Sequence, residues 1–133
     1  MIADPLSILI TDDDRRFRET VREVIAPQGF RTLLAGDGQE ALEILQRDEV
    51  HLLLLDMHMP RLSGLETIER VKRLNSQLPC ILMSAEADEQ LVQRALEAQA
   101  FAVLRKPVSR DTIICNVRQA LRRAYDWRER HSQ

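Results

Sequence analysis

The sequence predicts an α/β fold in which a five-stranded parallel sheet is covered on both faces by helices, a doubly wound arrangement. Short apolar runs alternate along the chain with segments whose apolar residues recur at helical spacing. The run at 50–55 is apolar at every position except His51, which is typical of a strand buried on both faces. The length of 133 residues suits one domain with a single core.

Five runs rich in aliphatic residues predict the strands of this sheet. They cover residues 6–11, 30–35, 50–55, 79–83 and 100–104. Because a helical segment separates each run from the next, successive strands are expected to be parallel and joined by right-handed crossovers. In the flavodoxin-like arrangement the strand order is 2-1-3-4-5, which makes the first and third strands neighbours.

Each of the first four strands is followed by an amphipathic helix, which its apolar stripe identifies. Asp14 is the simplest choice for the cap of the first helix. Asp37 is expected to open the second helix, with Glu40 three residues later in the capping-box position. The four stripes are Phe17, Val21, Val24 and Ile25; Ala41, Leu42 and Leu45; Leu65, Ile68 and Val71; and Leu91, Ala95 and Leu96.

The last helix is expected to begin at Ser109 and to be longer than one domain needs, with a pattern that continues toward Trp127 and Arg130. We therefore expect one domain over residues 1–124. Residues 125–133 are expected to extend the last helix, as a linker to an output domain or a contact with a second copy. The arginines of this helix most simply form its solvated face. Its apolar face comprises Ile113, Val117, Leu121 and Ala124.

The composition argues against several classes of protein. A formal charge of -2 and an aromatic content of 4% disfavour direct nucleic-acid binding by this chain. Cys80 and Cys115 have the spacing of neither a metal site nor a disulfide framework, and both are expected to be buried thiols. No apolar run approaches the roughly 20 residues that span a bilayer, and residues 1–7 lack a signal-peptide pattern. We expect a cytoplasmic protein without membrane contact.

Polar residues follow the predicted strands at the points where these strands end. Asp12 and Asp13 follow the first strand, Asp56 the third, Ser84 the fourth and Lys106 the fifth. The carboxyl ends of parallel strands share one edge, and ligands bind there at the point where the strand order reverses. Each residue alone would be an ordinary helix cap or strand-end residue. As a set, they are expected to converge.

The convergence of three carboxylates with a lysine and a hydroxyl indicates a particular chemistry. Such a cluster of acids requires a compensating cation, and hard oxygen ligands favour Mg²⁺. A carboxylate can act as a nucleophile and form an aspartyl-phosphate if the charge of the incoming phosphoryl group is neutralised. The Lys106 ammonium and the Ser84 hydroxyl would each hold a phosphoryl oxygen. The added charge, about -1.5 to -2, would reposition a hydroxyl or a loop, which makes a switch.

Four motifs at these strand ends resemble those of the receiver domains of bacterial two-component response regulators, the phosphoacceptor fold of the chemotaxis regulators. They are ILITDDD at 8–14, LDMHMP at 55–60 with Ser63 and Gly64, LMSA at 82–85 and LRKP at 104–107. The resemblance covers about residues 6–124. It implies a signalling switch rather than an enzyme in the ordinary sense, which catalyses its own Mg²⁺-dependent phosphorylation and dephosphorylation.

The resemblance also implies a phosphoacceptor and its metal ligands. Asp56 is the expected phosphoacceptor, which receives the phosphoryl group from a histidine kinase or a phosphotransfer protein. Mg²⁺ is expected to be bound directly by Asp13 and Asp56. Asp12 is expected to contribute through a water molecule, and His58 through its backbone carbonyl.

The resemblance further implies how the signal leaves the site. Ser84 is the expected switch hydroxyl and Lys106 the phosphate-pairing residue, which precedes a cis peptide bond to Pro107. Phosphorylation is expected to alter a surface built from the fourth helix, the fifth strand and the fifth helix. That surface would contact an output domain or form a homodimer.

Two positions depart from the pattern of the family. Val103 stands three residues before the lysine, where an aromatic partner of the switch hydroxyl is usual, and Phe101 lies two positions earlier. Gln99 replaces a common glycine, so the turn into the fifth strand is expected to differ or to be strained. The resemblance implies that His58 and Glu86, each two residues beyond a site residue, occupy positions at which the family tunes the lifetime of the phosphoryl group.

Two alternatives belong to other functional classes. One is a pseudo-receiver, which keeps the fold and signals by binding alone; the complete set of site residues speaks against it. The other is a hydrolase with an aspartyl-phosphate intermediate. Haloacid-dehalogenase-like enzymes of that kind need a second acid two residues after the nucleophile, where this chain has His58, and the chain leaves no room for a substrate cap.

Overall fold

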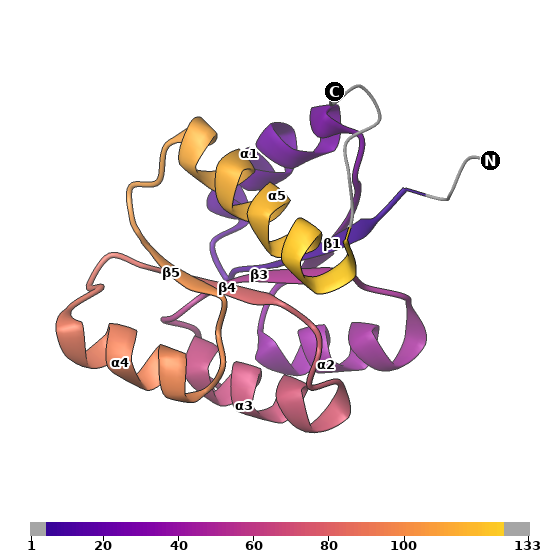
Figure 1. Cartoon of the computed structure of the whole chain (residues 1–133). Helices are drawn as coiled ribbons and strands as arrows, with labels where there is room; N and C mark the ends of the chain where they lie inside the picture. Colours follow the sequence, from indigo (N-terminus) through magenta and orange to yellow (C-terminus); the bar gives the residue numbers. More distant parts are fainter. Residues whose placement is uncertain (1–4, 127–133) are drawn as a thin grey trace.

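The computed structural model describes residues 5–126, in which five strands and five α-helices alternate along the chain (Figure 1). All predicted elements are present, and the strand ends differ from prediction by no more than two residues. The strands are β1 Ser7–Thr11, β2 Arg31–Ala35, β3 Leu52–Asp56, β4 Cys80–Ser84 and β5 Ala102–Arg105. The helices are α1 Arg15–Ile25, α2 Gly38–Arg47, α3 Gly64–Leu74, α4 Glu89–Glu97 and α5 Arg110–Tyr125, with a 3₁₀ turn at Ala26–Gln28.

The five strands form one parallel sheet in the order β2-β1-β3-β4-β5, which confirms the predicted topology. In this register Thr11 pairs with Leu55, at the ends of β1 and β3. Ser84, at the end of β4, pairs with Arg105, at the end of β5. The carboxyl ends of these four strands are therefore level with one another at one edge of the sheet.

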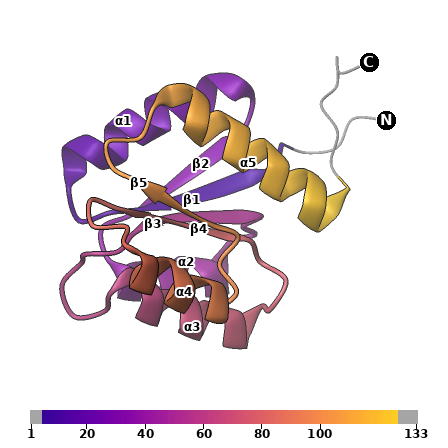
Figure 2. The ribbon, with the colours of Figure 1, turned by 60° about the vertical axis from the view of Figure 1, so that its left-hand side comes forward.

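Helices cover both faces of the sheet, as Figure 2 shows: α1 and α5 lie on one face, and α2, α3 and α4 on the other. The leucines of β3 alternate between the two cores. Leu52 and Leu54 pack with α1 and α5, whereas Leu53 and Leu55 pack with α2 and α3, and all four are fully buried. This two-sided burial is the reason that β3 reads as a continuous apolar run. No helix within residues 5–126 is both long and apolar enough to cross a membrane.

The helix caps agree with prediction at α1 and differ in one detail at α2. The Asp14 carboxylate caps α1 by accepting from the N–H groups of Arg16 and Phe17. Asp37 caps α2 by accepting from the Glu40 N–H at 2.8 Å. The Glu40 carboxylate, however, accepts from the N–H of Gly36 at 2.7 Å instead of closing a capping box on Asp37. It thereby fixes the turn that leads into the helix.

Three side chains that were expected to face the core are exposed. Cys80 is fully buried, but Cys115 is exposed, because it lies two residues beyond Ile113 and so about 200° around the helix from this core residue. Leu96 is 56% exposed, since the buried stripe of α4 is narrow and contains only Leu91 and Ala95. In α5 the buried stripe ends at Leu121, so Ala124 is exposed as well.

The carboxyl end of α5 contacts the edge of the sheet where the strands begin. The Tyr125 hydroxyl donates to the His51 carbonyl at 2.8 Å, and the two rings meet edge to face. His51 in turn accepts from the Ser7 N–H through its Nδ1. The helix ends at Tyr125, and Asp126 caps it with left-handed backbone, φ 52°. Residues 127–133, which were predicted to continue the helix, lie outside the described residues.

Candidate functional site

The residues singled out at the strand ends meet at the carboxyl edge of the sheet. Asp12 directly follows β1, and its N–H donates to the Ala35 carbonyl of β2. Asp56 is the last residue of β3, Ser84 the last of β4, and Lys106 directly follows β5. The parallel topology thus brings together residues that are as many as 94 positions apart in the chain.

Asp12, Asp13 and Asp56 form a compact group of acids. Each offers a carboxylate oxygen that lies within 4.8 Å of those offered by the other two. Asp12 and Asp56 are buried, at 1% and 6% exposure, whereas Asp13 is exposed. The group is therefore accessible to solvent from the side of Asp13, while Asp56, the candidate phosphoacceptor, is buried at the end of β3.

Lys106 reaches into this group from β5. Its Nζ lies 2.7 Å from Asp56 Oδ1 and 3.2 Å from Asp12 Oδ2. Burial alone would favour the neutral amine and lower the pKa of Lys106. The hydrogen bond to Asp56 and the charges of both carboxylates outweigh this effect, so the pKa of Lys106 is raised. The ammonium also lies 3.9 Å from the centre of the Phe17 ring, which shields it from solvent on one side.

Asp12 is held through both its side chain and its main chain. Its Oδ1 accepts from the Asp14 N–H at 2.8 Å, and its main-chain carbonyl accepts from Arg18 Nη1 at 2.8 Å. Burial raises the pKa of Asp12, an effect to which the nearby charge of Asp56 adds and which the Asp14 N–H and Lys106 oppose. Asp12 is consequently a position where added positive charge would stabilise the carboxylate.

The second oxygen of Asp56 is positioned by the chain that follows β3. Oδ2 accepts from the His58 N–H at 3.1 Å, while the Met57 N–H donates to the Met83 carbonyl on β4. The chain then turns into α3, where the Gly64 N–H donates to the Met57 carbonyl at 2.8 Å. With Lys106 on Oδ1 and a main-chain N–H on Oδ2, the rotation of the Asp56 side chain is restricted.

Ser84 lies on the other side of Asp56, fully buried at the end of β4. Its hydroxyl oxygen accepts from the Glu86 N–H at 3.0 Å, and its main-chain carbonyl accepts from the Lys106 N–H at 2.9 Å. Glu86 also contacts the loop after β3, because its Oε1 lies 3.2 Å from His58 Nε2. The His58 side chain is therefore an exposed partner of Glu86 and stays away from the acidic group.

The two departures from the expected pattern are visible in the structure. Val103 is half-buried and packs with the core that α2, α3 and α4 cover, so β5 presents no aromatic ring at that position. Gln99 has left-handed backbone, φ 68°, which is the conformation that glycine adopts most easily. The peptide bond between Lys106 and Pro107 is cis, as expected.

The donor set fits a divalent cation. Three carboxylates and one ammonium leave two negative charges at the site, and the ion pairs of Asp12 and Asp56 both involve Lys106. Oxygen ligands with one exposed member suit an ion that retains several of its water molecules, which is the usual behaviour of Mg²⁺.

Sequence reasoning overlooked two residues that hold this site. Phe17 was assigned to the core stripe of α1, and its contact with the Lys106 ammonium was not foreseen. Arg18 drew no prediction, although its position four residues after Asp14 places it in the first turns of α1, near the end of β1. A basic residue at this helical spacing after an acidic strand end is the only signal in the sequence that points to it.

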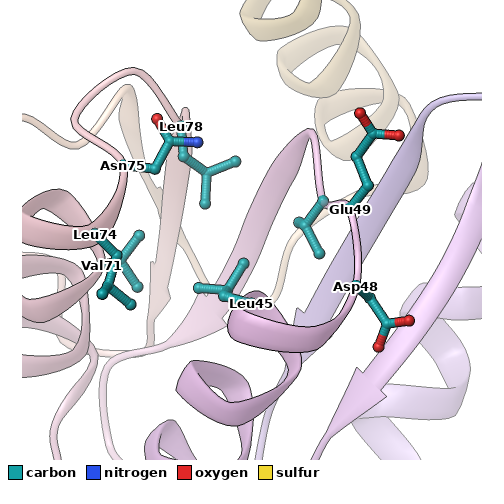
Figure 3. A pocket seen from close by; sticks show the side chains of 8 residues that line it. Leu45, Asp48, Glu49, Val71, Leu74, Asn75 and Leu78 are labelled. Atoms are coloured by element: carbon teal, nitrogen blue, oxygen red, sulfur yellow. The ribbon is translucent and has the colours of Figure 1, made fainter.

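A pocket of about 330 Å³ lies at the opposite edge of the sheet (Figure 3). It is placed where β3 and β4 begin, and so at the far end of the strands from Asp56. Its polar groups are side chains that flank an apolar interior, with none of the residues predicted to carry chemistry. It is lined by Leu45, Asp48, Glu49, Val50, Val71, Leu74, Asn75 and Leu78.

Comparison with known proteins gives a consistent family. The family model described as response regulator receiver domain matches residues 8–118. Response regulator MprA of Mycobacterium leprae (strain TN) is 36% identical over 118 residues, which are 89% of this chain and 52% of that protein. Transcriptional regulatory protein CpxR of Klebsiella pneumoniae subsp. pneumoniae (strain HS11286) is 36% identical over 122 residues, which are 92% and 51%. The chain thus spans about half the length of these relatives.

Solved structures show the same fold. A response regulator receiver domain protein from Clostridium thermocellum has a TM-score of 0.84 at 25% identity, with 89% of this chain and 95% of that chain covered. A CheY-like receiver domain protein from Methanospirillum hungatei JF-1 has a TM-score of 0.87 at 23% identity, with 92% and 98% covered. The family match over most of the chain, together with this fold and the acidic group at its carboxyl edge, leads to one conclusion: the chain belongs to the response regulator receiver domain family.

Proposed function

We propose that this domain is a cytoplasmic phosphorylation-dependent switch in which Asp56 accepts a phosphoryl group from a histidine kinase or a phosphotransfer protein. The observation that carries the proposal is the pair of contacts from Lys106 to Asp56 and Asp12 within a group of three carboxylates. A lysine and a cation-binding acidic group around one restrained carboxylate are what an aspartyl-phosphate site requires.

In the proposed reaction a carboxylate oxygen of Asp56 attacks the phosphorus atom of a phosphohistidine. The new P–O bond forms as the P–N bond breaks, and the departing imidazole takes a proton from solvent. Lys106 is already beside Asp56 Oδ1, so its ammonium is placed to stay with the phosphoryl oxygens as negative charge accumulates there. The His58 N–H at Oδ2 restrains the carboxylate for attack.

Bound Mg²⁺ would supply charge neutralisation for the incoming phosphoryl group. Asp13 and Asp56 would hold it directly, Asp12 through water, and His58 through its main-chain carbonyl. Asp13 is the exposed member of the group, and so it is the one that faces an ion arriving from solvent.

The readout is proposed to be a change in the surface formed by α4, β5 and α5. Ser84 is expected to contact the phosphoryl group, and it lies at the end of β4. The loop after Ser84 leads directly into α4. Val92 and Leu96 on α4 are exposed, which favours an apolar contact with an output domain or a second copy.

Intact mass after incubation with acetyl phosphate tests the proposal. Wild type is expected to gain one hydroxylamine-labile phosphoryl group with Mg²⁺ and none with a chelator. Asp56→Asn, which removes the nucleophile and nearly preserves the size of the side chain, is expected to gain none. Asp111→Asn is the matched control, since Asp111 is an exposed acid of α5, and it should behave as wild type. Absence of an adduct on folded wild type would favour a pseudo-receiver instead.

A further inference from the structure

The loop between β4 and α4, residues 85–88, contacts two segments of the domain that are distant from it in sequence. One is the contact of 3.2 Å between Glu86 Oε1 and His58 Nε2. The other is a hydrogen bond of 3.0 Å from Arg105 Nη2 to the carbonyl oxygen of Ala87. Ala87 immediately precedes Asp88, the residue that caps α4. Arg105 therefore connects the end of β5 to the start of α4.

Arg105 is next to both Ser84 and Lys106, which are proposed to contact the phosphoryl group. In the register of the sheet it pairs with Ser84, and it directly precedes Lys106. A displacement of Ser84 toward Asp56 would consequently act on a strand position whose side chain already holds the loop.

Val103 and Arg105 project from the same face of β5, because they are two residues apart in a strand. Val103 has no polar group with which to bond the loop, and it packs into the core instead. Two positions further along the same face, the Arg105 side chain does bond residues 85–88, through the carbonyl of Ala87. The side chain of this face that bonds the loop thus lies two residues after position 103.

The loop is bonded to the Ser84 hydroxyl and lies beside a pocket. The Ser84 hydroxyl oxygen accepts from the Glu86 N–H, so turning this hydroxyl toward a phosphoryl group releases or drags the loop. Glu86 and Asp88 line a pocket of about 250 Å³, which Leu91 and Arg94 of α4 also border. This space therefore adjoins both the loop and the start of α4.

We propose that Arg105 is a positioning residue of the switch, which retains the β4–α4 loop in its unphosphorylated position by holding the Ala87 carbonyl. This role rests on the proposed function. Phosphorylation of Asp56 draws Ser84 toward the phosphoryl group, the bond between Arg105 and Ala87 breaks, and the start of α4 is released. Because the retained position opposes phosphorylation, loss of the bond makes phosphorylation easier.

Two measurements on the full chain test this role. The first is amide hydrogen exchange of residues 85–91 in unphosphorylated protein, which reports the opening of the loop without any phosphoryl chemistry. Arg105→Ala is expected to accelerate this exchange about fivefold, the effect of losing one hydrogen bond. The second is the phosphorylation rate at saturating acetyl phosphate, which is expected to rise by a similar factor.

Two variants separate positioning from charge. Arg110→Ala removes another exposed arginine, whose ion pair is with Asp111, and it should leave the loop exchange and the saturating rate as in wild type. Arg105→Lys keeps a charged donor and should restore most of the retention. Unchanged exchange in Arg105→Ala would overturn the role, as would faster exchange with an unchanged or lower saturating rate. If wild type takes up no phosphoryl group, the proposed function fails, while the exchange arm still shows whether Arg105 holds the loop.

Discussion

Replacement of Gly64 by alanine is expected to destabilise the domain and, at the same time, to disturb Asp56, the proposed phosphoacceptor. Gly64 opens α3, where its N–H bonds the Met57 carbonyl. A methyl group at this position would lie 2.5 Å from the carbonyl oxygen of Asp56, 2.5 Å from Leu82 Cδ1 and 2.9 Å from the Met57 Cα. Ordinary contact begins at 3.4 Å, so the start of α3 and the end of β3 must separate.

The magnitude follows from two opposing effects. Overpacking of a close contact costs about 1–3 kcal/mol, whereas alanine in place of glycine in a helix gains up to about 1 kcal/mol. Two of the three clashing atoms belong to the backbone of β3 and the segment after it, which cannot rotate away. We therefore place the net loss of unfolding free energy at about 2 kcal/mol.

Equilibrium unfolding in urea measures this loss, and the rate of phosphorylation by acetyl phosphate measures the disturbance of Asp56. Gly36→Ala is the matched control, because the nearest atoms to its new methyl group are Arg18 Nη1 and Glu40 Oε1, the ends of flexible side chains. The control should remain within about 0.5 kcal/mol of wild type. A Gly64→Ala protein with wild-type stability and rate would refute the reasoning.

Three further predictions concern stability and reactivity. Gln99→Gly should raise the unfolding free energy by about 1 kcal/mol, because it relieves left-handed backbone; a lower urea midpoint would contradict this. An aromatic disulfide reagent should modify one thiol in the native protein, the exposed Cys115, and Cys80 only after unfolding, since burial raises the pKa of Cys80 to about 12; two fast thiols would show otherwise. The hydrogen bond from the Glu40 N–H, followed by Arg61, lowers the pKa of Asp37, so its stabilising effect is complete above its unfolded pKa of about 3.9 and fades as the pH falls below that value. Asp37→Ala should accordingly cost about 1 kcal/mol at pH 7 and less at pH 3, and a pH-independent cost in urea titrations would count against this.

Much of the site was predictable because the fold class places strand ends in known relation to one another. Once β1 and β3 are assigned as neighbours in a parallel sheet, Asp12 and Asp56 must meet at one edge, although 44 residues separate them. The prediction needs only the strand ends, which short apolar runs between helical segments supply, and the topology, which the flavodoxin-like strand order supplies. The cap of α1 by Asp14 was predictable for a similar reason, since it depends on residues three positions apart.

The errors of prediction occur where local periodicity is a weak guide. Cys115 and Leu96 lie in helices whose apolar residues outnumber the positions that face the sheet, and the helical angle alone decided which of them are buried. Glu40 was expected to bond Asp37 and bonds Gly36 instead, because a side chain of this length reaches more than one N–H group.

The amino-acid sequence by itself determined the α/β class, the strand order and the set of residues at the carboxyl edge. The class and the strand-end residues follow from short-range patterns repeated along the chain, and the order follows from the flavodoxin-like arrangement that these patterns resemble. Only the tertiary structure decided that Lys106 bridges two carboxylates, that Phe17 lies against its ammonium and that Arg105 holds the Ala87 carbonyl. Such contacts depend on where long side chains point across strands that are distant in sequence, and no local pattern records that direction.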